Sequence, residues 1–224
     1  GEVTAAKFLY NLGVPVGENA MLYSNAAYVA KKVMSNANYR TPYWKDDLGL
    51  LHAEGTEYLG YEPSFEGDLS DYNATLGLKN EKNGWKQDIS LTVGGNQQLY
   101  TVSNTLNFSL GTASPTSFKP GGYGFSNVIG NIDISKSLTD NFAIGFGSEV
   151  RRETYKIIAG DTASYAGPYN GQAPGANSFP GIKAENASTN SRFNLGGYLD
   201  ASWDITREFL LNGTIRAENY SDFG

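Results

Sequence analysis

Alternation of apolar and polar residues with a period of two is the feature that most constrains the fold of this chain. In residues 142–151 the apolar side chains of Phe142, Ile144 and Phe146 alternate with small or charged neighbours such as Glu149. Successive side chains of a β-strand point to opposite faces, so this pattern predicts strands with one apolar and one polar face. Six segments carry it: 72–79, 85–93, 128–136, 142–151, 193–205 and 209–218.

The connections between these segments alternate in length. Short turns are predicted at 81–84, 138–141 and 206–208. Long connections rich in Gly, Pro, Ser, Thr and Asn occupy about 96–122 and 159–190. The pattern predicts an all-β antiparallel meander in which each strand pairs with its sequence neighbour. Transmembrane β-barrels sort their connections in this way, although a soluble sheet with one solvated face has the same alternation along its strands.

The N-terminal third carries weaker signals. Residues 3–12 alternate enough to predict one further strand. Residues 13–69 are interpreted as one very long extracellular loop with some local structure. Within this region, the segment from Ala26 to Met34 (AAYVAKKVM) is readable as a short helix.

Composition excludes several classes of function. The formal net charge is −6, which argues against nucleic acid as a partner because phosphate binding needs clustered Lys and Arg. The chain has no cysteine, so it contains no disulfide, thiolate nucleophile or cysteine-based zinc site. Charged residues make up only 18%, beside 27 Gly and 15 Tyr, which suits a chain rich in strands and turns.

A short motif that occurs twice in the sequence supplies the candidate site residues. Arg151-x-Glu153 and Arg216-x-Glu218 recur on two strands that are predicted to run in the same direction, each on the polar face. The favoured interpretation is a ladder of ion pairs that bridges neighbouring strands or, in a barrel, holds a plug in the lumen. The alternative, if the sheet belongs to a transmembrane barrel, is a polar lining that contacts a solute passing through it. These four side chains are therefore the candidate substrate-binding residues.

Other motifs do not add up to a catalytic or metal site. The sole histidine, His52, lies near Asp46, Asp47 and Glu54, and a solvated loop explains this group better than a metal. Asp222-Phe223-Gly224 matches the metal-binding tripeptide of kinases, but the glycine-rich loop, strand lysine and catalytic loop of a kinase have no counterpart. We therefore expect no enzyme activity, no cofactor and no metal.

Four stretches together carry a family resemblance. The end of the chain, Ile215-Arg216-Ala217-Glu218-Asn219-Tyr220-Ser221-Asp222-Phe223-Gly224, fits the pattern R-x-E-x-Y-S-D-F-G. Gly147-Ser148-Glu149-Val150-Arg151-Arg152-Glu153 followed by Tyr155 fits G-x-E-x-R-x-E-x-Y. The other two stretches are Ser178-Phe179-Pro180-Gly181 and Tyr10-Asn11-Leu12-Gly13. In combination they resemble the barrel domains of TonB-dependent outer-membrane receptors.

The resemblance implies a fold and a location. Residues 1–224 would form part of a transmembrane barrel of about 22 strands, in the outer membrane of a Gram-negative bacterium. Both ends of the sequence suggest a piece of a longer receptor. The plug domain and the TonB box of such receptors have no counterpart in these residues.

The resemblance also implies a function and its partners. The receptor would take up a scarce solute, such as a siderophore, a glycan or a peptide, with energy from the TonB system. Its partners would be outer-membrane lipid, the remaining strands and plug of the same receptor, the TonB system through the missing N-terminal part, and the extracellular solute. The competing interpretation is a soluble all-β binding module, such as a glycan-binding domain.

Overall fold

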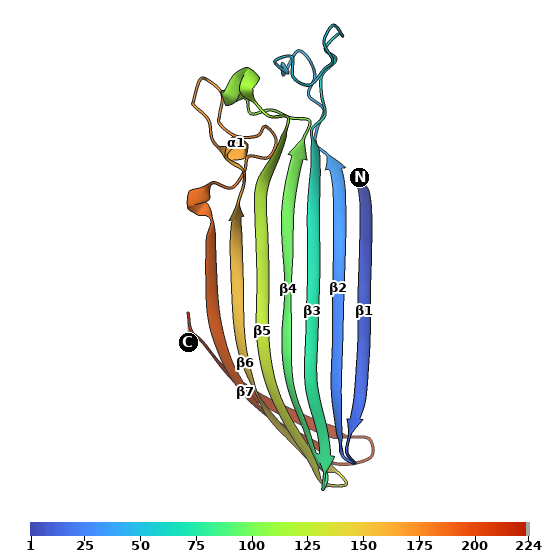
Figure 1. Ribbon diagram of the computed structural model, residues 1–224. Coiled ribbons are helices and arrows are strands. Elements are labelled where there is room, and N and C mark those ends of the chain that lie inside the picture. The colour runs from blue at the N-terminus through green and yellow to red at the C-terminus, as the bar shows by residue number, and fades with distance from the viewer. Residues whose placement is uncertain (223–224) are drawn as a thin grey trace.

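The computed structural model describes residues 1–222 as one antiparallel sheet (Figure 1). Its eight strands are β1 (Glu2–Val16), β2 (Ala20–Asn36), β3 (Ser64–Lys82), β4 (Trp85–Ser103), β5 (Ser117–Thr139), β6 (Phe142–Ala159), β7 (Ser188–Asp204) and β8 (Leu210–Tyr220). Each strand pairs with its neighbour in sequence, which confirms the predicted meander. Within the described residues the sheet does not close into a barrel, and β1 and β8 form its two edges.

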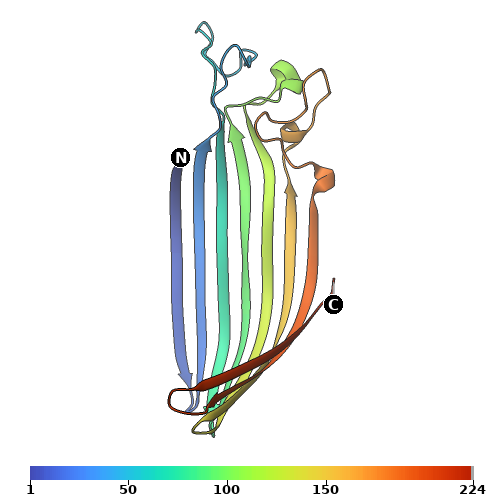
Figure 2. The same cartoon turned by 180° about the vertical axis from the view of Figure 1, so that it is seen from behind.

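Short and long connections lie at opposite ends of the sheet (Figures 1 and 2). The short ones are residues 17–19, 83–84, 140–141 and 205–209, and the long ones are 37–63, 104–116 and 160–187. The three predicted turns are confirmed. The turn between β3 and β4 has positive φ at both central residues, Asn83 and Gly84, as a tight hairpin requires. The later long connections are shorter than predicted because the strands beside them extend further.

The expectation for residues 13–69 is wrong. β1 continues to Val16, β2 fills Ala20–Asn36, and only residues 37–63 form a long connection. The predicted helix from Ala26 to Met34 is a strand. Alanine favours helices in isolation, but β2 pairs with β1 on one side and β3 on the other along this stretch, and such pairing overrides a local preference.

Helical segments are few and short. They are η1 (Phe108–Ala113), α1 (Thr162–Tyr165) and η2 (Ala184–Asn186), all in the long connections. No helix in residues 1–222 is long and apolar enough to cross a membrane.

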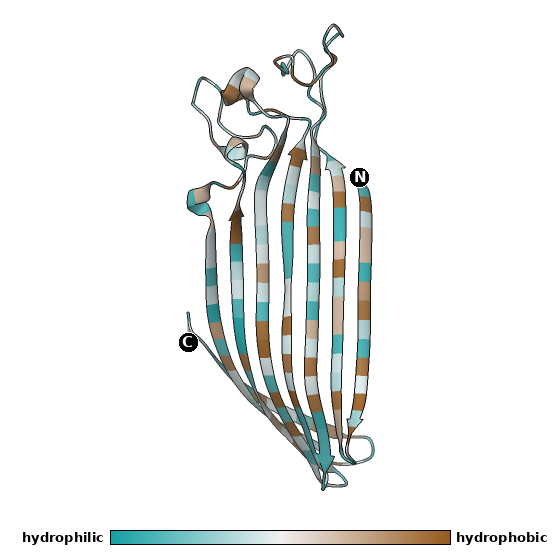
Figure 3. Ribbon diagram, in the orientation of Figure 1, coloured by the Kyte–Doolittle hydropathy of each residue, from teal (hydrophilic) through white to brown (hydrophobic). Residues whose placement is uncertain are grey.

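The two faces of the sheet differ in chemistry, as predicted. The register puts Phe142, Ile144, Phe146, Leu199, Ala201, Trp203, Leu211 and Ile215 on one face, here called the apolar face. Phe209 begins the predicted strand 209–218, but it lies in the connection before β8. Glu149, Arg151, Asp200, Arg216 and Glu218 lie on the opposite face, here called the polar face. Figure 3 shows the alternation as bands along each strand.

The buried core lies at the long-connection end of the sheet, where Val102 of β4 and Phe118 of β5 meet the connections. Large apolar side chains on the apolar face are exposed, with Ile215 at 74% and Leu199 at 64%. The buried hydrophobic residues lie instead toward the long connections: Tyr61, Val102, Leu106, Phe118 and Ala176. The long connections therefore pack together into a small core, whereas the middle of the sheet is a single layer.

Candidate functional site

The four predicted site residues meet in one ion-pair network on the polar face. Arg151 contacts Glu149 through Nη2 at 2.7 Å and Glu153 through Nη1 at 3.5 Å. Arg216 contacts the same Glu149 oxygen at 3.6 Å and donates from Nε to Glu218. Glu149 thus joins the arginine of β6 to the arginine of β8. These pairs lie mostly within one strand, and among these residues Glu149 alone links β6 to β8 across β7, whereas solute contact by these residues stays a prediction.

A glycine on the strand between them allows this contact. Gly196 of β7 lies opposite Glu149 of β6 and Glu218 of β8. A Cβ atom at Gly196 would lie 3.1 Å from Nη2 of Arg216, closer than ordinary van der Waals contact. The missing side chain therefore leaves room for charged groups of β6 and β8 to reach each other across β7.

Further residues extend the network toward the long connections. Arg192 of β7 contacts Glu153 at 2.6 Å and Asp222 at 3.6 Å. The hydroxyl of Tyr220 donates to Glu218 at 3.0 Å, and the Arg192 guanidinium lies 4.9 Å from the Tyr220 ring centre. The sequence motifs missed Arg192 as a site residue. The alternation of faces along β7 could have identified it, because this alternation places Arg192 on the same face as Glu149, Arg151 and Glu153 of β6.

The network is partly shielded from solvent. The side chains of Glu149 and Glu153 are only 15% and 13% exposed. Nε of Arg151 is buried without a hydrogen-bond partner among the described residues. Hydrogen bonds between carboxylates and guanidinium groups are short and directional, so these side chains hold each other in place. The site can present fixed charges and hydrogen-bonding groups.

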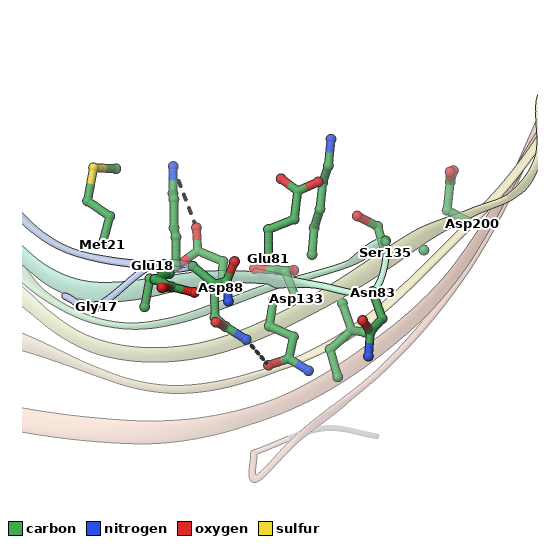
Figure 4. Close-up of a pocket in the computed structure, with 18 of the residues that line it drawn as sticks. Gly17, Glu18, Met21, Glu81, Asn83, Asp88, Asp133, Ser135 and Asp200 are labelled. Atoms are coloured by element: carbon green, nitrogen blue, oxygen red, sulfur yellow. Dashed lines mark hydrogen bonds and ion pairs between the residues drawn. The ribbon is translucent and has the colours of Figure 1, made fainter. Parts of the chain in front are cut away.

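A hollow of about 1110 Å³ lies on the polar face near the short connections (Figure 4). Acidic side chains predominate among its charged residues: Glu18, Glu81, Asp88, Asp133 and Asp200, beside Lys79 and Lys86. In residues 1–222 no group of three or more His, Asp or Glu side chains is placed to hold a metal ion.

Two tyrosines fix the aspartates at the centre of this hollow. Tyr23 donates to Asp88 at 2.8 Å, and Tyr198 donates to Asp133 at 2.6 Å. Asp88 and Asp133 are themselves register partners on β4 and β5. Lys79 lies 3.8 Å from Asp88 and over the Tyr23 ring. The sequence placed both aspartates on polar faces, but it missed Tyr23 because β2 was interpreted as loop.

Hydrogen bonds and ring contacts join the long connections to one another at one end of the sheet. Asn107 is fully buried and donates to the carbonyl oxygens of Ala163 and Ala166, joining connection 104–116 to connection 160–187. Phe179, from the Ser178–Gly181 motif, packs edge-on against the rings of Phe65 and Tyr100. The long connections are therefore held to one another and to the ends of β3 and β4.

The prediction that the carboxylates around His52 are solvated is wrong for Asp47. Asp47 is 1% exposed and accepts hydrogen bonds from the backbone N–H groups of Gly49 and Leu51, with Nδ1 of His52 at 2.6 Å. Burial works to raise the pKa of Asp47, but these bonds outweigh it and hold the pKa below its usual value. Asp47 therefore organises the tip of connection 37–63.

Aromatic side chains project from this tip. Tyr43 is 92% exposed and Trp44 is 56% exposed. The Arg40 guanidinium lies 5.0 Å from the Trp44 ring centre and donates to the hydroxyl of Ser178 at 2.8 Å. The tip thus carries exposed rings on a segment that is tied to connection 160–187.

Comparison with protein-family models and with curated proteins gives no match. The resemblance to TonB-dependent receptors therefore rests on the four stretches quoted above. The last two residues of one stretch, Phe223 and Gly224, lie outside the described residues.

Proposed function

We propose that this chain forms part of the wall of a transmembrane β-barrel in a bacterial outer membrane. The barrel serves a receptor that takes up a scarce solute, such as a siderophore, a glycan or a peptide, with energy from the TonB system. One observation carries the proposal. All eight strands belong to one sheet that exposes an apolar face on one side and an ion-paired polar face on the other.

The apolar face suits contact with lipid. Burying one Leu, Ile or Phe side chain is worth about 1.5–3 kcal/mol, so the exposed set would be costly in water. On β7 the alternation runs from Phe193 to Trp203, close to the roughly 9–11 residues that a strand needs to cross a bilayer. The strands continue beyond this band, toward the long connections.

Aromatic residues mark the rim of the band near the short connections. Trp85, Phe142 and Trp203 lie on the apolar face at this end. Nζ of Lys136 lies 5.0 Å from the Trp85 ring centre. Aromatic girdles at both interfaces are typical of outer-membrane barrels, because such rings have an apolar body and tolerate the headgroup layer.

The polar face and the long connections suit a lumen and a capture surface. Charges such as Glu149 and Arg151 would be costly in a dry sandwich core but not beside a wet channel. The exposed rings of Tyr43 and Trp44 offer stacking surfaces to an incoming solute. The same rings would serve the alternative, a soluble glycan-binding module. That alternative needs a second layer over the apolar face, and residues 1–222 supply none.

Single-cysteine labelling tests the membrane location, because the chain contains no cysteine of its own. Variants of the intact protein would carry cysteine at Leu199 or Ile215 on the apolar face, or at Asp200 or Arg216 on the polar face. A membrane-impermeant maleimide applied to purified outer membranes, open to water at both surfaces, should label the polar-face pair. Equal labelling of both pairs would contradict lipid contact.

Solute uptake requires its own test. Deleting the tip residues 41–58 from the intact receptor should abolish energised uptake of the solute while leaving the labelling pattern of the wall unchanged. The solute is identified beforehand as a growth supplement that supports the wild type but not a strain that lacks the receptor. Uptake that continues after collapse of the inner-membrane proton gradient would exclude the TonB mechanism.

A further inference from the structure

Charges on β5, β6 and β7 are sorted between the two faces of the sheet. The carboxylates Asp133, Glu149, Glu153 and Asp200 all lie on the polar face. On the apolar face, the paired segments of these three strands carry only three charged residues, all basic: Lys136, Arg152 and Lys156. Lys136 lies near the short connections, and the other two lie beyond the apolar band on the opposite side.

Arg152 and Lys156 lie in a polar belt. Ser126 of β5 is the register partner of Thr154, and Thr154 is the partner of Ser191 on β7. The hydroxyls of Thr154 and Ser191 are 2.8 Å apart. The belt therefore sets two cations and three hydroxyl groups directly above the apolar residues of the same strands.

Neither cation is neutralised by the described part of the chain. Arg152 and Lys156 are exposed, and neither forms an ion pair with a carboxylate of residues 1–222. Arg152 lies 5.9 Å from the Phe193 ring centre, which holds it at the edge of the band. By contrast, Lys32 at the far side of the apolar face is paired with Glu66 and Asp68.

A shallow hollow of about 220 Å³ adjoins the belt. Its lining includes Ser70, Gln97, Ser126, Thr154 and Lys156. Hydroxyl and amide donors beside an ammonium group suit the oxygens of a phosphate. The hollow opens on the same face as the apolar band, so a group bound there could be joined to an acyl chain lying along that band.

We propose that Arg152 and Lys156, with the hydroxyls of the belt, bind the phosphate of anionic lipid headgroups in the leaflet on the long-connection side. This inference rests on the proposed membrane location. Basic residues next to a bilayer attract anionic lipid, with an effect of about fivefold in affinity for each charge. The two cations together should therefore enrich anionic lipid by about 25-fold.

Lipid quenching of a local probe tests the proposal. The intact protein would carry one fluorophore at Thr189→Cys, a position directly opposite Lys156. It is reconstituted in phosphatidylcholine vesicles with brominated phosphatidylglycerol or brominated phosphatidylcholine as quencher. We expect brominated phosphatidylglycerol to be preferred. Arg152→Gln with Lys156→Gln should remove the preference, whereas Arg152→Lys with Lys156→Arg should retain it.

A matched control neutralises two cations on the polar face. Lys7→Gln with Lys31→Gln changes the net charge equally and should leave the preference intact. An unchanged preference in the Arg152 and Lys156 double variant would overturn the inference, as would displacement of the lipid by free inorganic phosphate. Absence of quenching by either lipid, with a fluorophore at Ile215→Cys also unquenched, would instead contradict the membrane location.

Discussion

The hydroxyl of Tyr198 on β7 donates to Asp133 on β5 across the intervening strand β6. The ring passes over Gly147, where a Cβ atom would lie 2.5 Å from it. The same arrangement recurs on β2 to β4, where the Tyr23 ring covers Gly77 and its hydroxyl reaches Asp88. Each arrangement links three strands through one side chain, and the two converge on neighbouring strands β4 and β5.

Removing the Tyr198 hydroxyl should destabilise the sheet. Tyr198→Phe leaves Asp133 without its 2.6 Å donor and should lower the free energy of unfolding by about 1–3 kcal/mol. Urea unfolding of the intact protein in detergent measures the change. Tyr28→Phe is the matched control, because Tyr28 lies exposed on the apolar face. Equal effects of the two substitutions would mean that the hydrogen bond contributes nothing specific.

Glu149 and Arg216 should be energetically coupled. Their 3.6 Å contact joins β6 to β8, and a double-mutant cycle with Glu149→Gln and Arg216→Gln should give a coupling energy of about 0.5–1 kcal/mol. The cycle is measured from unfolding midpoints. A control cycle uses Lys183 and Glu185, whose side chains are 57% and 73% exposed, and should give a value near zero. A coupling energy of zero for Glu149 and Arg216 would contradict a stabilising ion pair between β6 and β8.

The tip of connection 37–63 should loosen in acid. Because the pKa of Asp47 is lowered on folding, its stabilisation is complete above the ordinary value of 3.8 and is lost as the pH falls through the lowered pKa. Pepsin cleavage within 37–63 should therefore increase steeply below that pH. In Asp47→Asn the tip should be cleaved readily at every acidic pH, whereas Glu54→Gln should behave like the wild type. Cleavage of the wild type that does not vary over this range would contradict the role of Asp47.

Much of the sheet could be predicted from sequence, because strand parity is a strict rule. Once Phe146 and Glu149 are assigned to opposite faces, the faces of their neighbours on β6 follow. Alternation along β6 and β8 allowed Arg151, Glu153, Arg216 and Glu218 to be placed on one face from the sequence alone. The contact of Arg216 with Glu149 across β7 could not be predicted in this way. It uses the space left by the missing side chain of Gly196.

The failures have a different physical cause. β2 has alanines where other strands have large apolar residues, so its face pattern was too weak to distinguish a strand from a helix. Tyr23 was missed for that reason. The burial of Asp47 was missed because it depends on backbone N–H groups of Gly49 and Leu51, which no side-chain pattern reveals.

The sheet expressed alone as residues 1–224 should aggregate or require detergent. In the described part of the chain β1 and β8 each have only one neighbour, so both edges carry unpaired N–H and C=O groups that can pair with other chains. The apolar face adds many exposed large hydrophobic side chains, and soluble monomers rarely expose large contiguous apolar patches. Size-exclusion chromatography without detergent should therefore give aggregates, and detergent should disperse them. A sharp monomeric peak with cooperative thermal unfolding would contradict the barrel wall and favour the soluble binding module.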